Sequence, residues 1–142
     1  MQLPLFVYGT LKPGESNYAG FLEGQTSAEH PARISGAELY TEGMYPYLVV
    51  TPGLVRPAAQ VYGMLMTLRP EVYVTALARV DGLEDYIAGN PNNWYERIKH
   101  PVQTDNSKVT AWIYVAGPST LAAIRAGRFR KIPGEVWSQQ VS

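Results

Sequence analysis

An apolar run near the start of the chain, residues 3–8 (LPLFVY), constrains the fold more than any other segment. Every side chain in it is apolar or aromatic, so both faces of a strand formed there must be covered. Such a strand lies at the centre of a sheet. Gly9 follows at once, and the chain then passes through a stretch rich in glycine, proline and hydroxyl residues. The sequence therefore predicts a central strand that ends abruptly in a turn at residues 8–11 (YGTL).

The remaining apolar pattern predicts more strands than helices. Five further segments are rich in β-branched and aromatic residues and have Gly, Pro or Asn at their boundaries. The last two form an antiparallel pair joined by a turn at residues 104–107 (TDNS). Gly63 is consistent with a bulge, a close backbone approach or an ordinary packing position. These five predicted strands cover residues 33–43, 45–50, 58–68, 94–102 and 108–117.

Two helices are predicted. The first covers about residues 70–80, because a proline at its start, an acidic first turn and apolar residues at helical spacing favour it. It is interrupted or tightened at Asp81-Gly82 and resumes for a turn through Tyr86. The second covers residues 117–127. Six strands and two helices in so short a chain predict an α+β fold with a curled or closed sheet.

Length and composition exclude several classes of protein and site. The 142 residues suit one domain, predicted over residues 1–142, with one core. Because the chain has no cysteine, it has no disulfide, thiolate nucleophile or sulfur-ligated zinc, and its two histidines have no metal-binding spacing, so neither metal nor cofactor is expected. Twelve basic residues balance twelve acidic ones, which disfavours nucleic acid and anionic membranes as partners.

No apolar stretch approaches the length of a membrane span, and the N-terminus lacks the pattern of a signal peptide. We therefore expect a cytoplasmic protein; nothing in the sequence specifies an oligomeric state. One cluster of cations, which is consistent with a solvated helix end or a binding patch, comprises Arg125, Arg128, Arg130 and Lys131.

Glu84 is the charged residue whose position is most informative. On a continuous helix it follows Leu77 by seven residues and points within about 20° of the same direction, toward the buried face. A buried carboxyl has a pKa above its reference of about 4.3, which suits a general acid/base. Two other interpretations are open: the helix ends at Asp81-Gly82 and lets Glu84 reach water, or Glu84 pairs with Arg97.

The turn at residues 8–11 is the second candidate. Gly9 permits close backbone approach, and successive N–H groups there can bind an anion such as a carboxylate, although a glycine that only permits the turn is the alternative. The phosphate-binding patterns GxGxxG and GxxxxGK[ST] are absent, which disfavours nucleotides. Thr10 has no adjacent base that would make it a nucleophile. Tyr95 and Tyr114 are interpreted as core aromatics or substrate ligands.

With these residues in view, the sequence resembles the γ-glutamylcyclotransferase-like family. Single motifs are short, but together they follow one another in order through nearly the whole chain. They are FVYGTLKPGESNY, GAELYTEGMYPYLV, VYGMLMTL, VDGLEDY, WYERI and AWIYV. The resemblance implies a small mixed β-barrel flanked by helices, with the YGTL turn at the mouth of a cavity and one glutamate inside it.

The resemblance also implies a reaction. The α-amine of a γ-glutamyl group attacks its own γ-carbonyl, closes 5-oxoproline and expels an amine or amino acid, so the substrate supplies the nucleophile and no cofactor is required. Glu84 would move the proton from the ammonium to the leaving nitrogen. Substrate-binding residues implied by the family are Tyr8, Gly9, Thr10 and Leu11, through their backbone, and Tyr45, Tyr95 and Tyr114, which line the cavity.

The chain departs from the family pattern at two points. Asp85 stands where the family often has Gly, and the segment at residues 87–93 (IAGNPNN) is longer than the compact form. Both departures bear on which leaving group the protein accepts rather than on the reaction itself. Two other functions are considered beside the cyclotransferase: a non-catalytic module that binds a small molecule in the same cavity, and a hydrolase in which Glu84 activates water.

Overall fold

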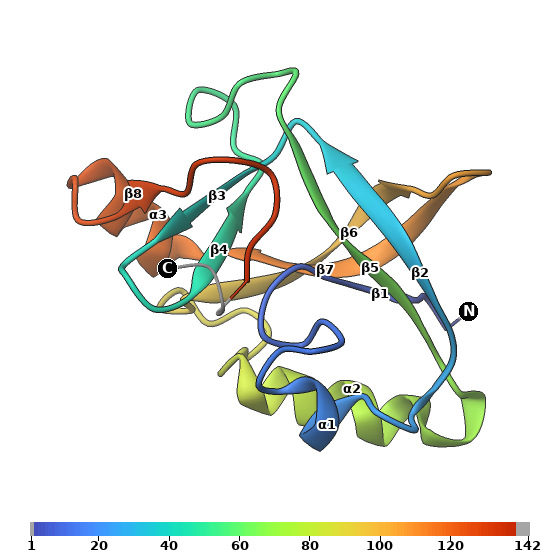
Figure 1. The fold of residues 1–142 in the computed structure, drawn as a ribbon. Helices are drawn as coiled ribbons and strands as arrows, with labels where there is room; N and C mark the ends of the chain where they lie inside the picture. The colour runs from blue at the N-terminus through green and yellow to red at the C-terminus, as the bar shows by residue number, and fades with distance from the viewer. Residues whose placement is uncertain (1, 139–142) are drawn as a thin grey trace.

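The computed structural model describes residues 2–138 (Figure 1). The predicted domain extends over residues 1–142, of which residues 1 and 139–142 lie outside the described part. In chain order the helices and strands are β1 (Leu5–Val7), α1 (Tyr18–Phe21), β2 (Thr26–Ser35), β3 (Glu38–Thr41), β4 (Pro46–Val49), β5 (Gln60–Leu68), the 3-10 turn η1 (Pro70–Val72), α2 (Tyr73–Leu83), β6 (Tyr95–Gln103), β7 (Lys108–Ala116), α3 (Pro118–Arg125) and β8 (Arg130–Lys131).

Five strands close into a barrel in the order β1-β5-β2-β6-β7. Neighbours are antiparallel except where β7 returns to β1, with Leu5 opposite Trp112 in a parallel pairing. Further along, β7 pairs in parallel with β4, where Leu48 lies opposite Val115, and β3 and β8 extend the sheet beyond β4. The α+β barrel that the family resemblance implies is therefore confirmed.

Strand β1 is covered on both faces, as its apolar sequence predicts. Phe6 points into the barrel core, whereas Leu5 and Val7 belong to a second cluster with α2 residues such as Leu77 and Val80. Helices α1 and α2 lie together on one side of the barrel (Figure 1). Because both layers of core pack on this one short strand, the end of β1 is held in place where the chain turns into residues 8–11.

The predicted interruption of the first helix at Asp81-Gly82 is wrong. Helix α2 runs without a break to Leu83, and Glu84 is its C-terminal capping residue. The helix then ends in a Schellman motif, in which the N–H of Tyr86 bonds the carbonyl of Asp81 at 2.9 Å and the N–H of Asp85 bonds that of Gly82 at 3.2 Å. Asp85 takes the left-handed conformation of this motif, with φ 55°.

The strand predicted over residues 33–43 is wrong in its bounds. Two strands share this stretch: β2 begins earlier, at Thr26, and Gly36, with φ 70°, separates it from β3. Residues 26–31 of β2 contain no buried side chain and end in Pro31, so this part lacks an apolar strand signal. The short elements α1 and β8 also lie outside the predicted set. No helix of residues 2–138 is long and apolar enough to cross a membrane.

Gly63 lies where two strands approach closely. A Cβ atom built on it would lie 2.2 Å from the carbonyl oxygen of Val7 and 2.8 Å from the Phe6 ring. Of the three interpretations of this glycine, the close backbone approach is the one found. It allows β5 to pack against the strand that leads into the turn at residues 8–11.

We expect Gly63→Ala to lower the free energy of unfolding by about 3 kcal/mol or more, because the new methyl group meets backbone that must move. Gly82→Ala is the matched control: its Cβ would meet nothing within 4 Å, and alanine in a helix gains about 0.5–1 kcal/mol over glycine. Urea unfolding of both variants measures the difference. A loss below about 1 kcal/mol at Gly63 would contradict the close approach.

Asp85→Gly is expected to raise the free energy of unfolding by about 1 kcal/mol. Glycine adopts positive φ without strain, and the change also removes a negative charge from the negative end of a helix. Asp85→Asn removes only the charge and should give a smaller gain. Unfolding midpoints in urea at low ionic strength test this order, and a destabilised Asp85→Gly protein would refute it.

Candidate active site

One cavity of about 330 Å³ lies at the end of β1. Its walls come from the turn after β1, the start of β4, the end of α2 and the adjoining ends of β6 and β7. All eight predicted site residues line it: Tyr8, Gly9, Thr10, Leu11, Tyr45, Glu84, Tyr95 and Tyr114. Segments distant in sequence thus meet at one place, although the lining alone assigns no role to any of them.

Glu84 enters this cavity from the C-terminal end of α2. Burial raises the pKa of its carboxyl from 4.5 to about 7. Within residues 2–138 its carboxylate has no hydrogen bond or ion pair, and Arg97 pairs with Asp81 instead, at 3.0 Å. The Arg97 partner considered from the sequence is therefore not what the structure contains, and the helix does not end at Asp81-Gly82; the Glu84 side chain is partly exposed, at the cavity. A carboxyl in this state is able to exchange a proton near neutral pH.

The turn at residues 8–11 forms the facing wall. Gly9 packs against Pro46 so closely that a Cβ atom would lie 2.9 Å from the proline ring. In the described part of the chain, the amide N–H groups of Gly9, Thr10 and Leu11 donate no hydrogen bond to protein acceptors. Asn17, which also lines the cavity, fixes the turn by donating from its amide nitrogen to the Thr10 hydroxyl at 2.9 Å. Unpaired amides beside a cavity are suited to bind an anion or a polarised carbonyl oxygen.

The Tyr8 hydroxyl joins two strands at the cavity. It donates to the Tyr114 carbonyl of β7 at 2.6 Å and accepts from the Leu48 N–H of β4 at 3.2 Å. The hydroxyl therefore replaces backbone ladder bonds at the point where β7 leaves β1 and joins β4. Burial raises the pKa of this phenol far above its ordinary range, so it stays protonated. The hydroxyl of Tyr8 consequently has a structural task.

Other tyrosines make the cavity wall rigid. Tyr95 donates its hydroxyl to the Pro46 carbonyl at 2.9 Å and stacks on Tyr47 with ring centroids 4.4 Å apart. Tyr114 donates to the Asp81 carboxylate. Desolvation raises the pKa of Tyr95 and of Tyr114, and that of Tyr47 to about 12. These phenols are neutral at physiological pH, so they add no charge beside Glu84.

Several lining residues are not singled out by the sequence. Tyr47, Trp94 and Asn17 belong to this group; their aromatic or amide side chains look the same in sequence whether they pack in the core or line a site. Trp94 and Tyr45 remain 46% and 42% exposed and lie at the outer part of the lining.

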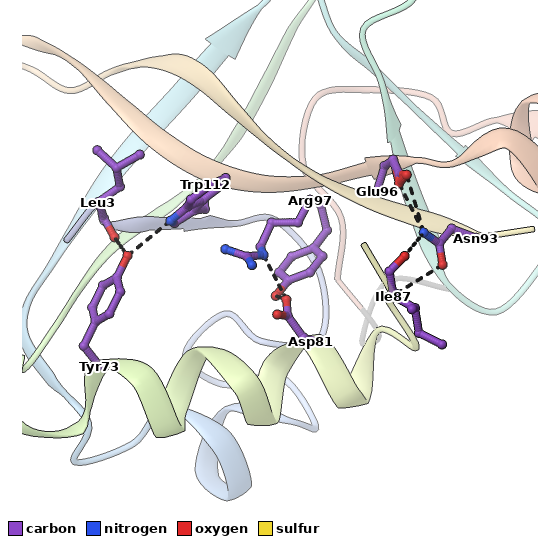
Figure 2. Close-up of polar contacts among 9 residues, drawn as sticks. Leu3, Tyr73, Asp81, Ile87, Asn93, Glu96, Arg97 and Trp112 are labelled. Atoms are coloured by element: carbon purple, nitrogen blue, oxygen red, sulfur yellow. Dashed lines mark hydrogen bonds and ion pairs between the residues drawn. The ribbon is translucent and has the colours of Figure 1, made fainter. Parts of the chain in front are cut away.

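The segment before β6 is held in place by Asn93. Its side chain accepts from the Ile87 N–H at 3.2 Å and donates to the Ile87 carbonyl at 2.8 Å and to Glu96 (Figure 2). The carbonyl of Asn93 accepts the Ser119 N–H, and that of Trp94 accepts the Thr120 hydroxyl at 2.6 Å. The longer segment therefore has a defined path, and it places Trp94 against the cavity.

The chemistry available in this cavity is proton transfer and anion binding. Its charged lining residues are Glu84 and Asp85, and no Lys, Arg or His lines it within residues 2–138. In the same part of the chain, no three acidic or histidine side chains gather as metal ligands.

Comparison with known proteins identifies relatives of this chain. The family described as "Gamma-glutamyl cyclotransferase, AIG2-like" matches residues 5–139. A Gamma-L-glutamyl-butirosin B gamma-glutamyl cyclotransferase from Niallia circulans is 34% identical over 112 residues, which are 78% of this chain and 65% of that protein. A putative gamma-glutamylcyclotransferase from Vibrio cholerae is 34% identical over 118 residues, 81% of this chain and 83% of that protein. The chain thus spans slightly less than two thirds of the Niallia protein.

Two solved structures have the same fold. YkqA from Bacillus subtilis has a TM-score of 0.65 at 23% identity, over 96% of this chain and 40% of that one. An AIG2-like protein from mouse has a TM-score of 0.64 at 20% identity, over 97% of this chain and 89% of that one. The family match covers the barrel, the turn after β1 and the end of α2 alike. The chain therefore belongs to the γ-glutamyl cyclotransferase, AIG2-like family.

Proposed function

We propose that this protein is a cyclotransferase that converts a γ-glutamyl amine to 5-oxoproline and a free amine. The observation that carries the proposal is a single carboxyl with a pKa of about 7, without a protein partner in the described residues, in a cavity whose opposite wall offers unpaired backbone amides. The family and the activities named for its relatives support the same reaction class. Residue roles follow from the chemistry of this arrangement.

The reaction takes two protons from the substrate's α-nitrogen, which starts as an ammonium and ends as the ring N–H of 5-oxoproline. The Glu84 carboxylate accepts the first proton from the α-ammonium, the free amine attacks the γ-carbonyl carbon, and a C–N bond forms as the ring closes. The protonated Glu84 then donates this proton to the nitrogen that leaves when the amide C–N bond breaks. The second proton passes from the ring nitrogen to the same carboxylate, which returns it to the free amine, so the amine leaves as an ammonium and Glu84 is again ionised. Because no water is consumed, the products are one 5-oxoproline and one amine. The amides of residues 9–11 would bind the substrate's carboxylate and the oxygen on which charge develops.

The lining also favours one class of leaving group. A leaving amino acid brings a carboxylate, whereas the cavity presents Asp85 and Glu84 and no cation among its described lining residues. Exposed aromatic faces at Trp94 and Tyr45 suit a cationic or apolar amine instead. Lys12 directly follows the turn, but its ammonium group donates to the Trp137 carbonyl and does not line the cavity. We propose a leaving amine without an adjacent carboxylate.

Glu84→Gln is expected to lower kcat/KM by at least ~100-fold, since the glutamine cannot carry the proton. In the wild type, kcat/KM should rise with pH through an acid limb near 7, because the carboxylate is the active form. Mass spectrometry detects 5-oxoproline, with Glu71→Gln at an exposed ion pair as the control. Free glutamate as product would indicate a hydrolase, and binding without turnover a non-catalytic module; either result contradicts the proposal.

The stability of Glu84→Gln separates lost chemistry from lost folding. Because the folded state holds the Glu84 proton more tightly than the unfolded chain does, wild-type stability should fall as pH rises from about 4.5 to 7. The Gln variant lacks this loss and should be more stable than the wild type at pH 8, by up to about 3 kcal/mol. Urea unfolding at pH 5 and pH 8 measures it. An inactive variant that is also less stable at pH 8 would contradict this account of Glu84.

The leaving-group preference is tested with three amides of equal length. γ-Glutamyl derivatives of 1,4-diaminobutane, pentylamine and 5-aminopentanoate place a cation, a methyl group or a carboxylate at the same distance. We expect kcat/KM to fall in that order, by about 5–10-fold per step. Asp85→Asn should reduce the preference for the cation and spare the pentylamine substrate. Fastest turnover of the carboxylate compound would overturn the leaving-group proposal while leaving the reaction itself supported.

A further inference from the structure

Asp81 connects the active-site end of α2 to the barrel. Its carboxylate lies 3.0 Å from Nε of Arg97 and accepts the Tyr114 hydroxyl at 2.5 Å. Arg97 on β6 and Tyr114 on β7 are cross-strand partners, so one carboxylate holds both members of a pair. Figure 2 shows Asp81 reaching up from α2 toward the Arg97 side chain.

Aromatic rings shield this ion pair from solvent. The Arg97 guanidinium lies over the Trp112 ring at 4.3 Å and over the Tyr86 ring at 5.6 Å. The two charged side chains are 18% and 22% exposed, whereas those of the Arg69–Glu71 pair near the start of the helix are 48% and 59% exposed. Water therefore screens the charges of the Arg97–Asp81 pair weakly and those of the Arg69–Glu71 pair strongly. Arg97 and Asp81 therefore compensate each other's charge at a place where an unpaired charge would act strongly on neighbouring groups.

Asp81 also lies about one helical turn before Glu84. Asp81 precedes Glu84 by three residues, so the two side chains are neighbours on one helix surface. Its backbone carbonyl accepts the Tyr86 N–H that closes the helix end, while its side chain binds β6 and β7. A shift of Asp81 would thus move the end of α2, and with it the carboxyl in the cavity.

We propose that Asp81, Arg97 and Tyr114 form a charge-neutral clamp that positions Glu84. Asp81 and Arg97 act here as positioning residues. The inference rests on the proposed function for its catalytic meaning, but it concerns the state of one carboxyl and is measurable without turnover. The clamp fixes the end of α2 against the β6–β7 hairpin. Its two charges cancel, so that Glu84 is largely buried in a place with little net electric field.

Cancellation matters because the phenols that face Glu84 add no charge of their own. The tyrosines that face it have raised pKa values and carry no charge near pH 7. Asp85 is exposed, and Lys99, two residues beyond Arg97, lies over Trp112. The neutral phenols line the cavity and are Tyr8 from the turn after β1, Tyr47 from β4, Tyr95 from β6 and Tyr114 from β7. The charged side chains on the elements that meet there are Asp81 and Asp85, from α2 and its end, and Arg97 and Lys99, from β6.

Removing the charge of Asp81 and removing that of Arg97 should therefore shift the pKa of Glu84 in opposite directions. Asp81→Asn leaves an uncompensated guanidinium, which favours the Glu84 carboxylate and should lower its pKa by about one pH unit. Arg97→Met keeps an apolar stem under the rings but leaves an uncompensated carboxylate, so the pKa of Glu84 should rise by about one pH unit. The double variant removes both charges and should return the pKa to within about half a unit of the wild type.

Carbon-13 NMR of the glutamate side-chain carboxyl, assigned with Glu84→Gln, follows this pKa in each variant. Arg69→Met and Glu71→Gln, which break the exposed pair, are matched controls and should not move it. If the residues served only for packing, every clamp variant would admit water and the pKa would fall in all three. That result, or no shift in any, overturns the proposal.

The design separates the failure of this inference from that of the function. If Arg97→Met does not fold, two variants still test the clamp. The pKa of Glu84 should fall in Asp81→Asn and should return toward the wild-type value in the double variant. With turnover present, the acid limb of kcat/KM should move in the same directions as the NMR pKa. Absence of turnover in the wild type would refute the proposed function, while opposite pKa shifts would still support the clamp.

Discussion

The cavity lies where β7, on the edge that does not pair with β6, has two partners in succession. Its first half pairs with β1 and closes the barrel, and its end pairs with β4, so β1 and β4 diverge. Backbone groups exposed by this divergence need hydrogen bonds, and the Tyr8 hydroxyl supplies them by bonding both Tyr114 and Leu48. The chain must then turn away from the barrel at once, which Gly9 permits by its close approach to Pro46. The opening and the wall of the candidate site thus have one structural origin.

The sequence predicted those parts of the fold whose signal is local. Strand β1 is apolar at every position, and β7 places Ala111, Ile113 and Val115 in the barrel core and Trp112 and Tyr114 toward α2, as its alternation indicates. The first half of β2 gave no such signal, because it is held by pairing with β5 rather than by burial of its own side chains. Pairing between strands that are distant in sequence does not produce a local sequence pattern.

The error at Asp81-Gly82 has a different cause. A glycine near a helix end commonly marks the stop, but here the residue with positive φ is Asp85, three positions later. An aspartate signals this conformation less clearly than glycine does. The side-chain role of Asp81 was equally hidden, since its partners Arg97 and Tyr114 come from strands distant in sequence. The candidate site residues, by contrast, could be named in advance, because the family resemblance carries spatial information that a single sequence lacks.

The position of Glu84 at the end of a helix also has an electrostatic consequence. The negative pole of α2 disfavours a carboxylate there, and burial acts in the same direction. A nearby lysine or arginine would reverse both effects, but Arg97 on the adjoining strand β6 is paired with Asp81 and lies over two aromatic rings. The fold thereby keeps a carboxyl near the midpoint of its titration at neutral pH, without a hydrogen-bond or ion-pair partner among residues 2–138. A group in that state can accept and return a proton at comparable cost, which is what the proposed ring closure would need.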